Sequence, residues 1–283
     1  MLLVIDVGNS SVSCGVFELD ARNGSRELVY DFKIATKNMS SDEYALTISS
    51  FLQFRNIFSS TSVAMPNISS AKFVDCAAIA SVVPGLTDAL VRASIQLTGK
   101  PPFIVEPGVK TGLSIRINTP QELGADIVAN AVFAITAVSS PVAILDVGTA
   151  TTLTVVDRNK CVLGSIIMPG LRVSLAALSG SAAQLSEVDL AFPDEIIGRN
   201  SVESVQSGVL RGHVLMIDGF LRNIREQYPH LTSADKLSLV STGGLVDCVI
   251  PHLRNKFTNY PSMTLQGIAL LYSMNCIRSQ NFV

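Results

Sequence analysis

The sequence lacks several features that would mark whole classes of protein. Its 283 residues carry a net charge of −2 and no run of Lys and Arg, so it has no electrostatic footprint for nucleic acid. Five cysteines occur without a CxxC pair, which argues against a zinc ribbon or a disulfide framework and fits a reduced, cytoplasmic setting. The three histidines, His213, His230 and His252, show no metal-ligand spacing. We therefore expect no nucleic-acid partner and assign the histidines no catalytic role.

A long uninterrupted apolar run is also missing. The N-terminus has no basic segment, and Asp6 interrupts its apolar stretch almost at once, which argues against a signal peptide. The longest apolar region, residues 128–145, is broken by Asn130 and by Ser139-Ser140-Pro141. A helix, a turn and a buried strand explain this region better than a membrane span, so we expect no membrane association.

One short pattern occurs twice. Residues 2–17 are LLVIDVGNSSVSCGVF and residues 141–156 are PVAILDVGTATTLTVV. In each, an apolar strand ends in Asp-Val-Gly before small hydroxyl and amide residues, which predicts a hairpin. Strands alternate with helices after both hairpins. The sequence therefore predicts two α/β domains, residues 1–115 and 116–283, that face each other across a cleft, with the last helix able to pack back on the first domain.

Two helix starts carry specific signals. In residues 119–137, Thr119 as N-cap, Pro120 at the first helical position and Glu122 form a capping box. Asn200 and Glu203 give the same signal for a long helix over residues 200–228. Shorter periodic segments predict further helices and strands: helices over 42–55, 85–97 and 265–275, and strands over 28–35, 73–84, 102–108, 161–170 and 237–244.

The repeated Asp-x-Gly turn can bind one end of a polyphosphate. Gly8 lets the backbone approach a ligand, and successive turn N–H groups form an anion nest. The Asp6 carboxylate can hold a cation that partly neutralises a phosphate. The alternative for a single copy is an Asx turn that merely closes a hairpin. Two copies, each opening one half of the chain, favour a polyphosphate held from both sides.

The paired hairpins resemble the phosphate motifs of the acetate and sugar kinase, Hsp70 and actin superfamily, and STGGLVD at 241–247 is similar to its adenosine turn. The whole chain resembles the type III pantothenate kinases more closely. The motifs that carry this resemblance are, in order, DVGNSS (6–11), SVVP (81–84), PGVKTGL (107–113), GAD (124–126), DVGTATT (146–152), GSIIMPGL (164–171), IGRNSVESVQSG (197–208), TGG (242–244) and LQGIALL (265–271).

The resemblance implies a fold of two duplicated actin-like, ribonuclease H-like α/β domains and an activity. The activity is transfer of the γ-phosphate of ATP to pantothenate, the first step of coenzyme A biosynthesis, by a homodimer that uses Mg²⁺ and a monovalent cation, K⁺ or NH₄⁺. Asp126 matches the family's proton acceptor, and Asp146 matches its K⁺ ligand. ATP would be bound by the first hairpin, by Thr149 of the second and by the adenosine turn. These residues are Asp6, Val7, Gly8, Asn9, Ser10, Ser11, Val12, Ser13, Thr149, Gly243 and Gly244. Asp6 would also bind Mg²⁺ through the phosphates.

The acceptor residues follow from the same resemblance. Gly124, Ala125, Asp126 and Ile127 match the segment that lines the pantothenate site, and Ser201 matches a substrate-contacting Thr. Asp126 is a lone carboxylate on an otherwise apolar helix, which is costly unless the carboxylate is paired or useful. The alternatives are a general base that acts on the acceptor hydroxyl and an Asp that is merely satisfied by a neighbouring donor.

The sequence departs from the family pattern on the acceptor side. Ile127 stands where the family usually has an Arg that helps to bind pantothenate, and Ser201 replaces the usual Thr. Arg116 or Arg199 could compensate. Two other functions therefore stay open beside the pantothenate kinase: a kinase of the same fold for a different small hydroxy acid, and a non-catalytic nucleotide-binding regulator. The retained Asp126 argues against the regulator.

Overall fold

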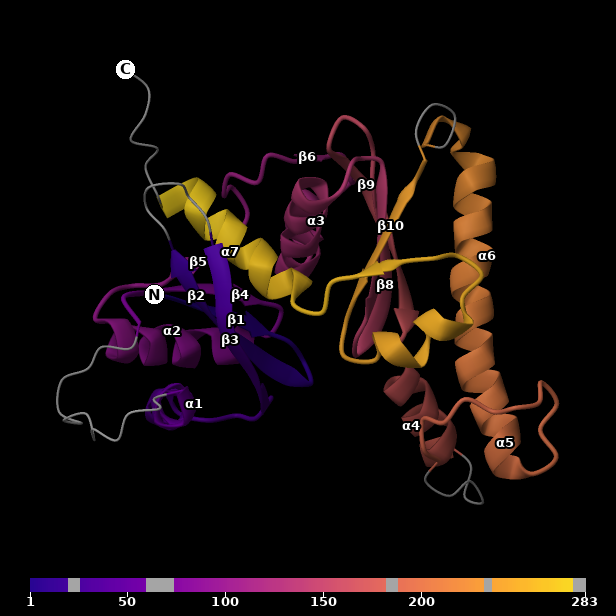
Figure 1. Cartoon of the computed structure of the whole chain (residues 1–283), viewed down its shortest axis with the longest axis horizontal. Helices are drawn as coiled ribbons and strands as arrows, with labels where there is room; N and C mark the ends of the chain where they lie inside the picture. Colours follow the sequence, from indigo (N-terminus) through magenta and orange to yellow (C-terminus); the bar gives the residue numbers. More distant parts are fainter. Residues whose placement is uncertain (20–25, 60–73, 182–187, 232–235, 277–283) are drawn as a thin grey trace. The chain divides into compact units, whose positions relative to one another are not determined.

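The structure is a computed structural model that describes residues 1–19, 26–59, 74–181, 188–231 and 236–276 (Figure 1). Its contacts divide the chain into two compact units. Unit 1 comprises Met1–Thr111, Gln121–Val132 and Thr264–Val283, and unit 2 comprises Gly112–Pro120 and Phe133–Met263. The C-terminal helix thus belongs to the N-terminal unit. The predicted boundary between residues 115 and 116 stays a prediction.

Unit 1 is built on a five-stranded sheet with the order β3-β2-β1-β4-β5. The first hairpin, β1 (Leu2–Val7) and β2 (Ser11–Leu19), is antiparallel, and β1 also pairs in parallel with β4 (Cys76–Ser81). The edge strands are β3 (Arg26–Ala35) and the two-residue β5 (Phe103–Ile104). The apolar residues of β1 are all buried and only Asp6 is partly exposed, as expected for a strand with both faces covered.

Helices cover both faces of this sheet (Figure 1). Helices α1 (Ser41–Ser59) and α2 (Pro84–Thr98) lie on one face, where Tyr44, Ile48 and Leu90 are fully buried against β1 and β2. Helix α7 (Met263–Cys276) covers the other face: a Cβ on Gly15 would lie 3.2 Å from Leu265. Gly267 of α7 in turn packs directly on the Ala129 carbonyl of α3 (Ala125–Ala137).

Unit 2 repeats this topology and extends it by one strand. Its sheet has the order β11-β10-β7-β8-β9-β6. The hairpin β7 (Val142–Val147) and β8 (Ala150–Val156) continues antiparallel into β9 (Cys161–Pro169), and β7 pairs in parallel with β10 (Ser238–Thr242). The two-residue strands β11 (Thr258–Asn259) and β6 (Ser114–Ile115) form the edges. Strands β7 to β11 thus follow the order of β1 to β5, which confirms the predicted α/β duplication.

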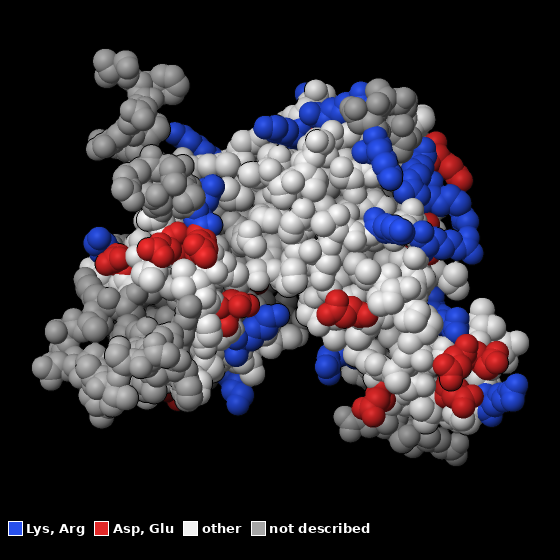
Figure 2. All heavy atoms as spheres, in the orientation of Figure 1, with Lys and Arg blue, Asp and Glu red and all other residues white. Residues whose placement is uncertain are grey.

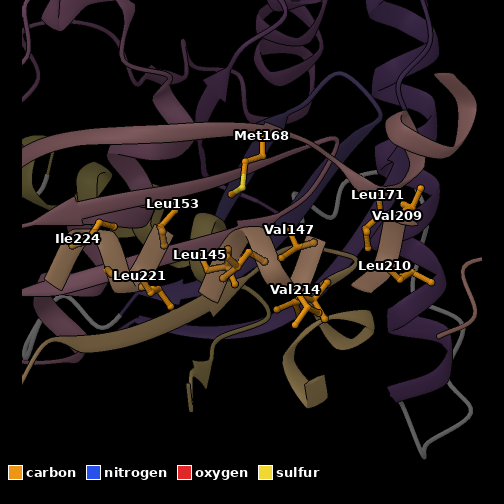
Figure 3. Close-up of a cluster of buried hydrophobic side chains, with 14 of the residues drawn as sticks. Leu145, Val147, Leu153, Met168, Leu171, Val209, Leu210, Val214, Leu221 and Ile224 are labelled. Atoms are coloured by element: carbon orange, nitrogen blue, oxygen red, sulfur yellow. The ribbon is translucent and has the colours of Figure 1, made fainter. Parts of the chain in front are cut away.

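Helix α6 (Gly212–Gln227) covers one face of the second sheet and closes its core. Leu145, Val147 and Leu153 point from the sheet towards Val214 and Leu221 of this helix (Figure 3). The apolar residues of α6 recur at helical spacing, as expected for a helix with one face on a sheet. Helix α4 (Leu171–Ser181), which the sequence analysis did not predict, begins directly after β9.

The long helix predicted over 200–228 is not a single α-helix. It consists of α5 (Ser201–Gln206), a π-helical turn (Ser207–Arg211) and α6. The Gly212 N–H reaches the Ser207 carbonyl five residues back, which defines the π turn. The predicted cap is confirmed, because Asn200 Oδ1 accepts the Glu203 N–H at 2.9 Å.

The helix predicted over 119–137 also needs correction. Pro120–Glu122 form only a 3₁₀ turn, and the α-helix begins at Ala125. The capping box therefore does not start α3. Two predicted strands are shorter than expected: β4 covers Cys76–Ser81 of the predicted 73–84, whose Phe73 lies outside the described residues, and β5 covers two residues of 102–108.

Charged side chains are unevenly distributed on unit 2. On the face shown in Figure 2, Lys and Arg gather around the end where α6 finishes, and Asp and Glu lie mainly near the end where α5 begins. Glu203 in the first turn of α5 and Arg225 in the last turn of α6 fit this polarity and complement the helix dipoles. Among the described residues, no helix is both long and apolar enough to cross a membrane.

Candidate active site

The first hairpin is a four-residue turn fixed by backbone contacts. The Gly8 N–H donates to the Ser11 carbonyl at 3.0 Å, and a Cβ on Gly8 would lie 3.2 Å from the same oxygen. Thr36, at the end of β3, donates its hydroxyl to the Gly8 carbonyl at 2.7 Å and its N–H to the Ser10 carbonyl at 3.2 Å. Asn9 and Ser10 are exposed at the tip. The turn thus presents Asn9 and Ser10 on a backbone that Thr36 holds from behind.

Asp126 lies at the same edge of the first sheet as this hairpin. A Cβ on Gly124 would collide with Asp126 Oδ1 and would lie 3.7 Å from Val82 Cγ1. The Val82 N–H donates to the carbonyl of Val7, the residue that enters the hairpin turn. The structure of unit 1 therefore brings together the first hairpin and Asp126, which are far apart in the sequence.

The Asp126 carboxylate is partly buried in the first turn of α3. Burial raises its pKa, and the Ile127 N–H, which donates to Asp126 Oδ1 at 2.8 Å, opposes this effect only in part. A carboxylate with a raised pKa is a stronger base than an exposed one. The Ile127 N–H satisfies one carboxylate oxygen. The alternative that Asp126 only accepts a hydrogen bond from a neighbour therefore explains this contact but not why the side chain is buried.

The second hairpin is one residue shorter than the first. The Gly148 N–H donates to the Ala150 carbonyl at 3.0 Å, and the Gly170 N–H, just before α4, donates to the Thr149 carbonyl at 3.2 Å. A Cβ on Gly170 would collide with this same carbonyl. Thr149 is exposed at the tip. Gly170 thus fixes the backbone of the second hairpin as Thr36 fixes that of the first, a contact that no local sequence pattern predicts.

The predicted adenosine turn lies against the second hairpin. Gly243 has a φ of 105°, and a Cβ there would lie 2.5 Å from Val147 N and 2.6 Å from Asp146 Oδ1. The Leu245 N–H also donates to the Val147 carbonyl at 3.1 Å. Unit 2 therefore brings together three of the predicted elements: the cation ligand Asp146, the hairpin with Thr149, and the glycine turn.

Asp146 has surroundings that fit a monovalent cation. Its Oδ1 lies beside two glycines, 2.6 Å from the Cβ position of Gly243 and 3.6 Å from that of Gly148, so both backbones come close to the carboxylate. K⁺ is a hard cation, and such cations prefer carboxylate and carbonyl oxygens. Within the described part of the chain, no three His, Cys, Asp or Glu side chains form a group that could hold a metal ion.

Ser201 lies in unit 2, whereas the GAD segment with Asp126 belongs to unit 1. Ser201 is exposed as the first residue of α5 and lines an open pocket of about 560 Å³. The other lining residues come from the same helix start and from α4: Leu178, Gly198, Arg199, Asn200, Ser204, Val205 and Gly208. A Cβ on Gly198 would collide with the Ser204 backbone, so this helix start is closely packed.

Comparison with known proteins identifies the family. The family model for type III pantothenate kinase matches residues 2–223. This chain belongs to that family. A type III pantothenate kinase from Dictyoglomus turgidum is 38% identical to it over 282 residues, which cover 97% of this chain and 100% of the relative. The type III pantothenate kinase of Agathobacter rectalis is 36% identical over 273 residues, 96% of each chain.

Solved structures show the same fold at low identity. A Baf family transcriptional activator from Campylobacter jejuni superposes with a TM-score of 0.55 at 18% identity, covering 96% of this chain and 97% of that one. The activator of a 2-hydroxyisocaproyl-CoA dehydratase from Clostridium difficile, solved with bound ADPNP, gives 0.54 at 9% identity, covering 100% and 99%. This chain thus shares its two-sheet α/β fold with these two proteins.

Proposed function

We propose that this chain transfers the γ-phosphate of ATP to the primary hydroxyl of pantothenate, giving 4′-phosphopantothenate in the first step of coenzyme A biosynthesis. The observation that carries the proposal, besides family membership, is the position of Asp126. Asp126 lies at the sheet edge that also carries the first phosphate hairpin, and burial raises the pKa of its carboxylate. Phosphoryl transfer to an alcohol needs both features, a base for the hydroxyl proton and donors for the phosphates.

The acceptor hydroxyl gives its proton to Asp126 in this mechanism. The Ile127 N–H holds Asp126 Oδ1 and so orients the carboxylate for this step. Gly124 has no side chain, and the space that a Cβ would fill is occupied by the carboxylate itself. Ala125 and Ile127 flank Asp126 and line the acceptor site, while Ser201 contributes a hydroxyl to substrate binding.

The two hairpins bind the nucleotide. Residues 6–13 bind the phosphates, chiefly through N–H and hydroxyl donors. Thr149 supports the phosphates from the second hairpin, and Gly243 and Gly244 lie against the adenosine. Mg²⁺ bound through the phosphates near Asp6, and K⁺ or NH₄⁺ at Asp146, would offset the negative charge that the phosphates bring. The surroundings of Asp146 support the cation assignment, because the two residues next to its Oδ1, Gly243 and Gly148, place no side chain beside the carboxylate.

The protein forms a homodimer in this proposal. Unit 2 exposes apolar side chains just before the pocket residue Gly198 in the sequence, with Ile196 exposed to 64% and Ile197 to 79%. Val202, Leu215 and Met216 on α5 and α6 are also exposed. Exposed apolar side chains of this size are what a partner surface would bury.

The proposal is tested by incubating the purified chain with ATP, Mg²⁺ and pantothenate, in K⁺ and separately in Na⁺, and quantifying 4′-phosphopantothenate. The expected result is product that depends on K⁺. Asp126→Asn should make none, whereas Asp88→Asn, at an exposed position of α2, should behave as wild type. Product only from another small hydroxy acid would replace pantothenate as the acceptor. Nucleotide binding without any transfer would leave the regulator as the remaining function.

A further inference from the structure

A buried polar pair lies behind the second phosphate hairpin. His213, on the first turn of α6, is exposed to only 1%, and its Nε2 lies 2.9 Å from the hydroxyl oxygen of Thr151 on β8. Thr151 is fully buried. Burial lowers the pKa of His213, so its imidazole is neutral at pH 7. The catalytic proposal uses neither residue.

This pair interrupts an otherwise apolar contact between α6 and the sheet. Thr151 pairs with Val147 on β7 and with Met168 on β9, and both partners belong to the core cluster under α6. Val147, Met168 and Val214 lie around this part of the helix–sheet contact (Figure 3). Polar groups in such a place cost stability unless they satisfy each other, and once paired they fix how two elements fit together.

The first hairpin shows that the fold does not need this polar pair. In unit 2, Thr151 pairs with Val147 directly after the hairpin turn. In unit 1, the residue that pairs with Val7 at the same point is Val12, which is fully buried in an apolar core. A valine therefore satisfies the packing at this position of the duplicated sheet. The hydroxyl of Thr151 and its imidazole partner must serve another purpose.

The helix that carries His213 is itself held in place by the π turn. Arg211 Nη2 donates to the Pro193 and Asp194 carbonyls at 2.8 Å each, and the Ser207 hydroxyl donates to the Ile196 carbonyl. Residues 193–196 lead directly to the cap of α5. These hydrogen bonds anchor the π turn to residues 193–196 and so hold the start of α6 in place. π turns also occur often near functional sites.

We propose that His213 is a positioning residue for phosphoryl transfer: through Thr151 it holds the second phosphate hairpin in the geometry that binds the ATP phosphates. Thr151 lies two residues after Thr149, within the same hairpin. A displacement of Thr151 would therefore move the exposed tip of the turn. The inference rests on the proposed role of this hairpin in binding ATP, and it adds the side chains that keep the hairpin in place.

The test compares two threonines of β8. Thr154 is also buried, and its hydroxyl lies 2.7 Å from that of Ser165, but it points to the opposite face of the strand and lies farther from the hairpin. Thr151→Val and Thr154→Val remove the same group from the same strand. Affinity for ADPNP with Mg²⁺ and K⁺ is measured by calorimetry, together with kcat, the two KM values and the thermal unfolding temperature.

Thr151→Val is expected to weaken ADPNP binding and raise the KM for ATP about tenfold, with the KM for pantothenate unchanged. Thr151→Ser, which keeps the hydroxyl, should restore binding to within about twofold of wild type, and Thr154→Val should stay within the same range although it unfolds at a lower temperature. His213→Leu should match Thr151→Val, and the double variant should be no weaker than either single one.

The proposal is overturned if Thr151→Val loses thermal stability as Thr154→Val does but binds ADPNP like wild type. It is also overturned if the effects of Thr151→Val and His213→Leu simply add. Because ADPNP binding does not depend on the acceptor, a chain that binds nucleotide but does not phosphorylate pantothenate would contradict the proposed function and still decide this inference.

Discussion

Gly243 lies so close to Asp146 that the two residues cannot both carry a side chain in this geometry. A Cβ on Gly243 would come within 2.6 Å of Asp146 Oδ1, and its φ of 105° is one that L-residues rarely adopt. The contact joins the end of β10 to the end of β7, where the register already pairs Thr242 with Asp146. The glycine turn and the predicted cation ligand therefore form one rigid piece of unit 2.

Replacement of Gly243 by Ala should damage nucleotide binding. The methyl group would push on Asp146 Oδ1 and on the Val147 backbone, and the strained φ adds a cost of about 1–3 kcal/mol. We expect ATP affinity to fall at least about tenfold and the thermal unfolding temperature to decrease. Isothermal titration with ADPNP and a thermal melt measure the two effects.

Gly219→Ala is the matched control for this substitution. Gly219 lies within α6 in the same unit, and a Cβ there would meet nothing within 4 Å. Alanine favours a helix interior over glycine by about 1 kcal/mol, so this variant should be as stable as wild type or more so, with unchanged affinity. Equal affinity for ADPNP in Gly243→Ala and Gly219→Ala would show that the glycine turn is not part of the nucleotide site.

Asp126→Asn should abolish turnover and leave nucleotide binding nearly unchanged. The amide can still accept the Ile127 N–H, but it cannot take a proton from the acceptor hydroxyl. Because burial raises the pKa of Asp126, wild-type kcat/KM should fall on acidification with a midpoint above about 3.9, the ordinary value for an Asp. A variant that kept more than about a tenth of the wild-type rate would remove Asp126 from the role of base.

Much of this site could be predicted from local patterns. Apolar runs ending in Asp-Val-Gly predict both hairpins, because a strand that ends in a glycine turn usually continues into a second strand. Asn200 and Glu203 cap α5 as their spacing predicts. Asp126 stands out because a carboxylate on an apolar helix is costly and so demands an explanation.

The capping box at Thr119 failed because capping is a local signal and α3 starts where tertiary contacts place it. Pro120–Glu122 do form a helical turn, as the residue types favour, but the turn is of the 3₁₀ type and ends before Gly124. The space left by the missing Cβ of Gly124 is filled by the Asp126 carboxylate. Local propensity alone cannot anticipate a boundary that the site itself requires.

The pairing of His213 with Thr151 had no local signal at all. The two residues are 62 positions apart in the sequence. The π turn over Ser207–Arg211, which precedes His213, has no sequence pattern of its own that would set it apart from an α-helix. One comparison within the sequence could have raised the question. Val12 and Thr151 stand at the same point of two otherwise similar hairpins, and only the second is polar.

Ile127→Arg should lower the KM for pantothenate. Ile127 is half-buried beside Asp126, where a guanidinium could pair with the carboxylate of the substrate. One charge-assisted hydrogen bond contributes about 1.5–3 kcal/mol, which corresponds to a KM lower by about 10- to 150-fold. Steady-state kinetics at saturating ATP measure it, and Ile127→Met supplies a long side chain without charge as the control. An unchanged KM would indicate that Arg116 or Arg199 already provides the contact, and Arg199→Met would then raise the KM.

Asp126→Asn should also make the protein more stable at neutral pH while it removes activity. Burial raises the folded-state pKa of Asp126 above its unfolded value. The protonated carboxyl group therefore contributes most to stability below the unfolded pKa. This contribution is lost as the pH rises through the folded pKa. An amide does not ionise and avoids that loss. We expect a gain of about 0.5–2 kcal/mol at pH 8 that shrinks towards pH 4, measured by denaturant unfolding across this range. Asp88→Asn, at an exposed site, should show no such trend. Equal stability of Asp126→Asn and wild type at pH 8 would mean that the ionised carboxylate is fully compensated in the folded protein, and burial would then not explain its basicity.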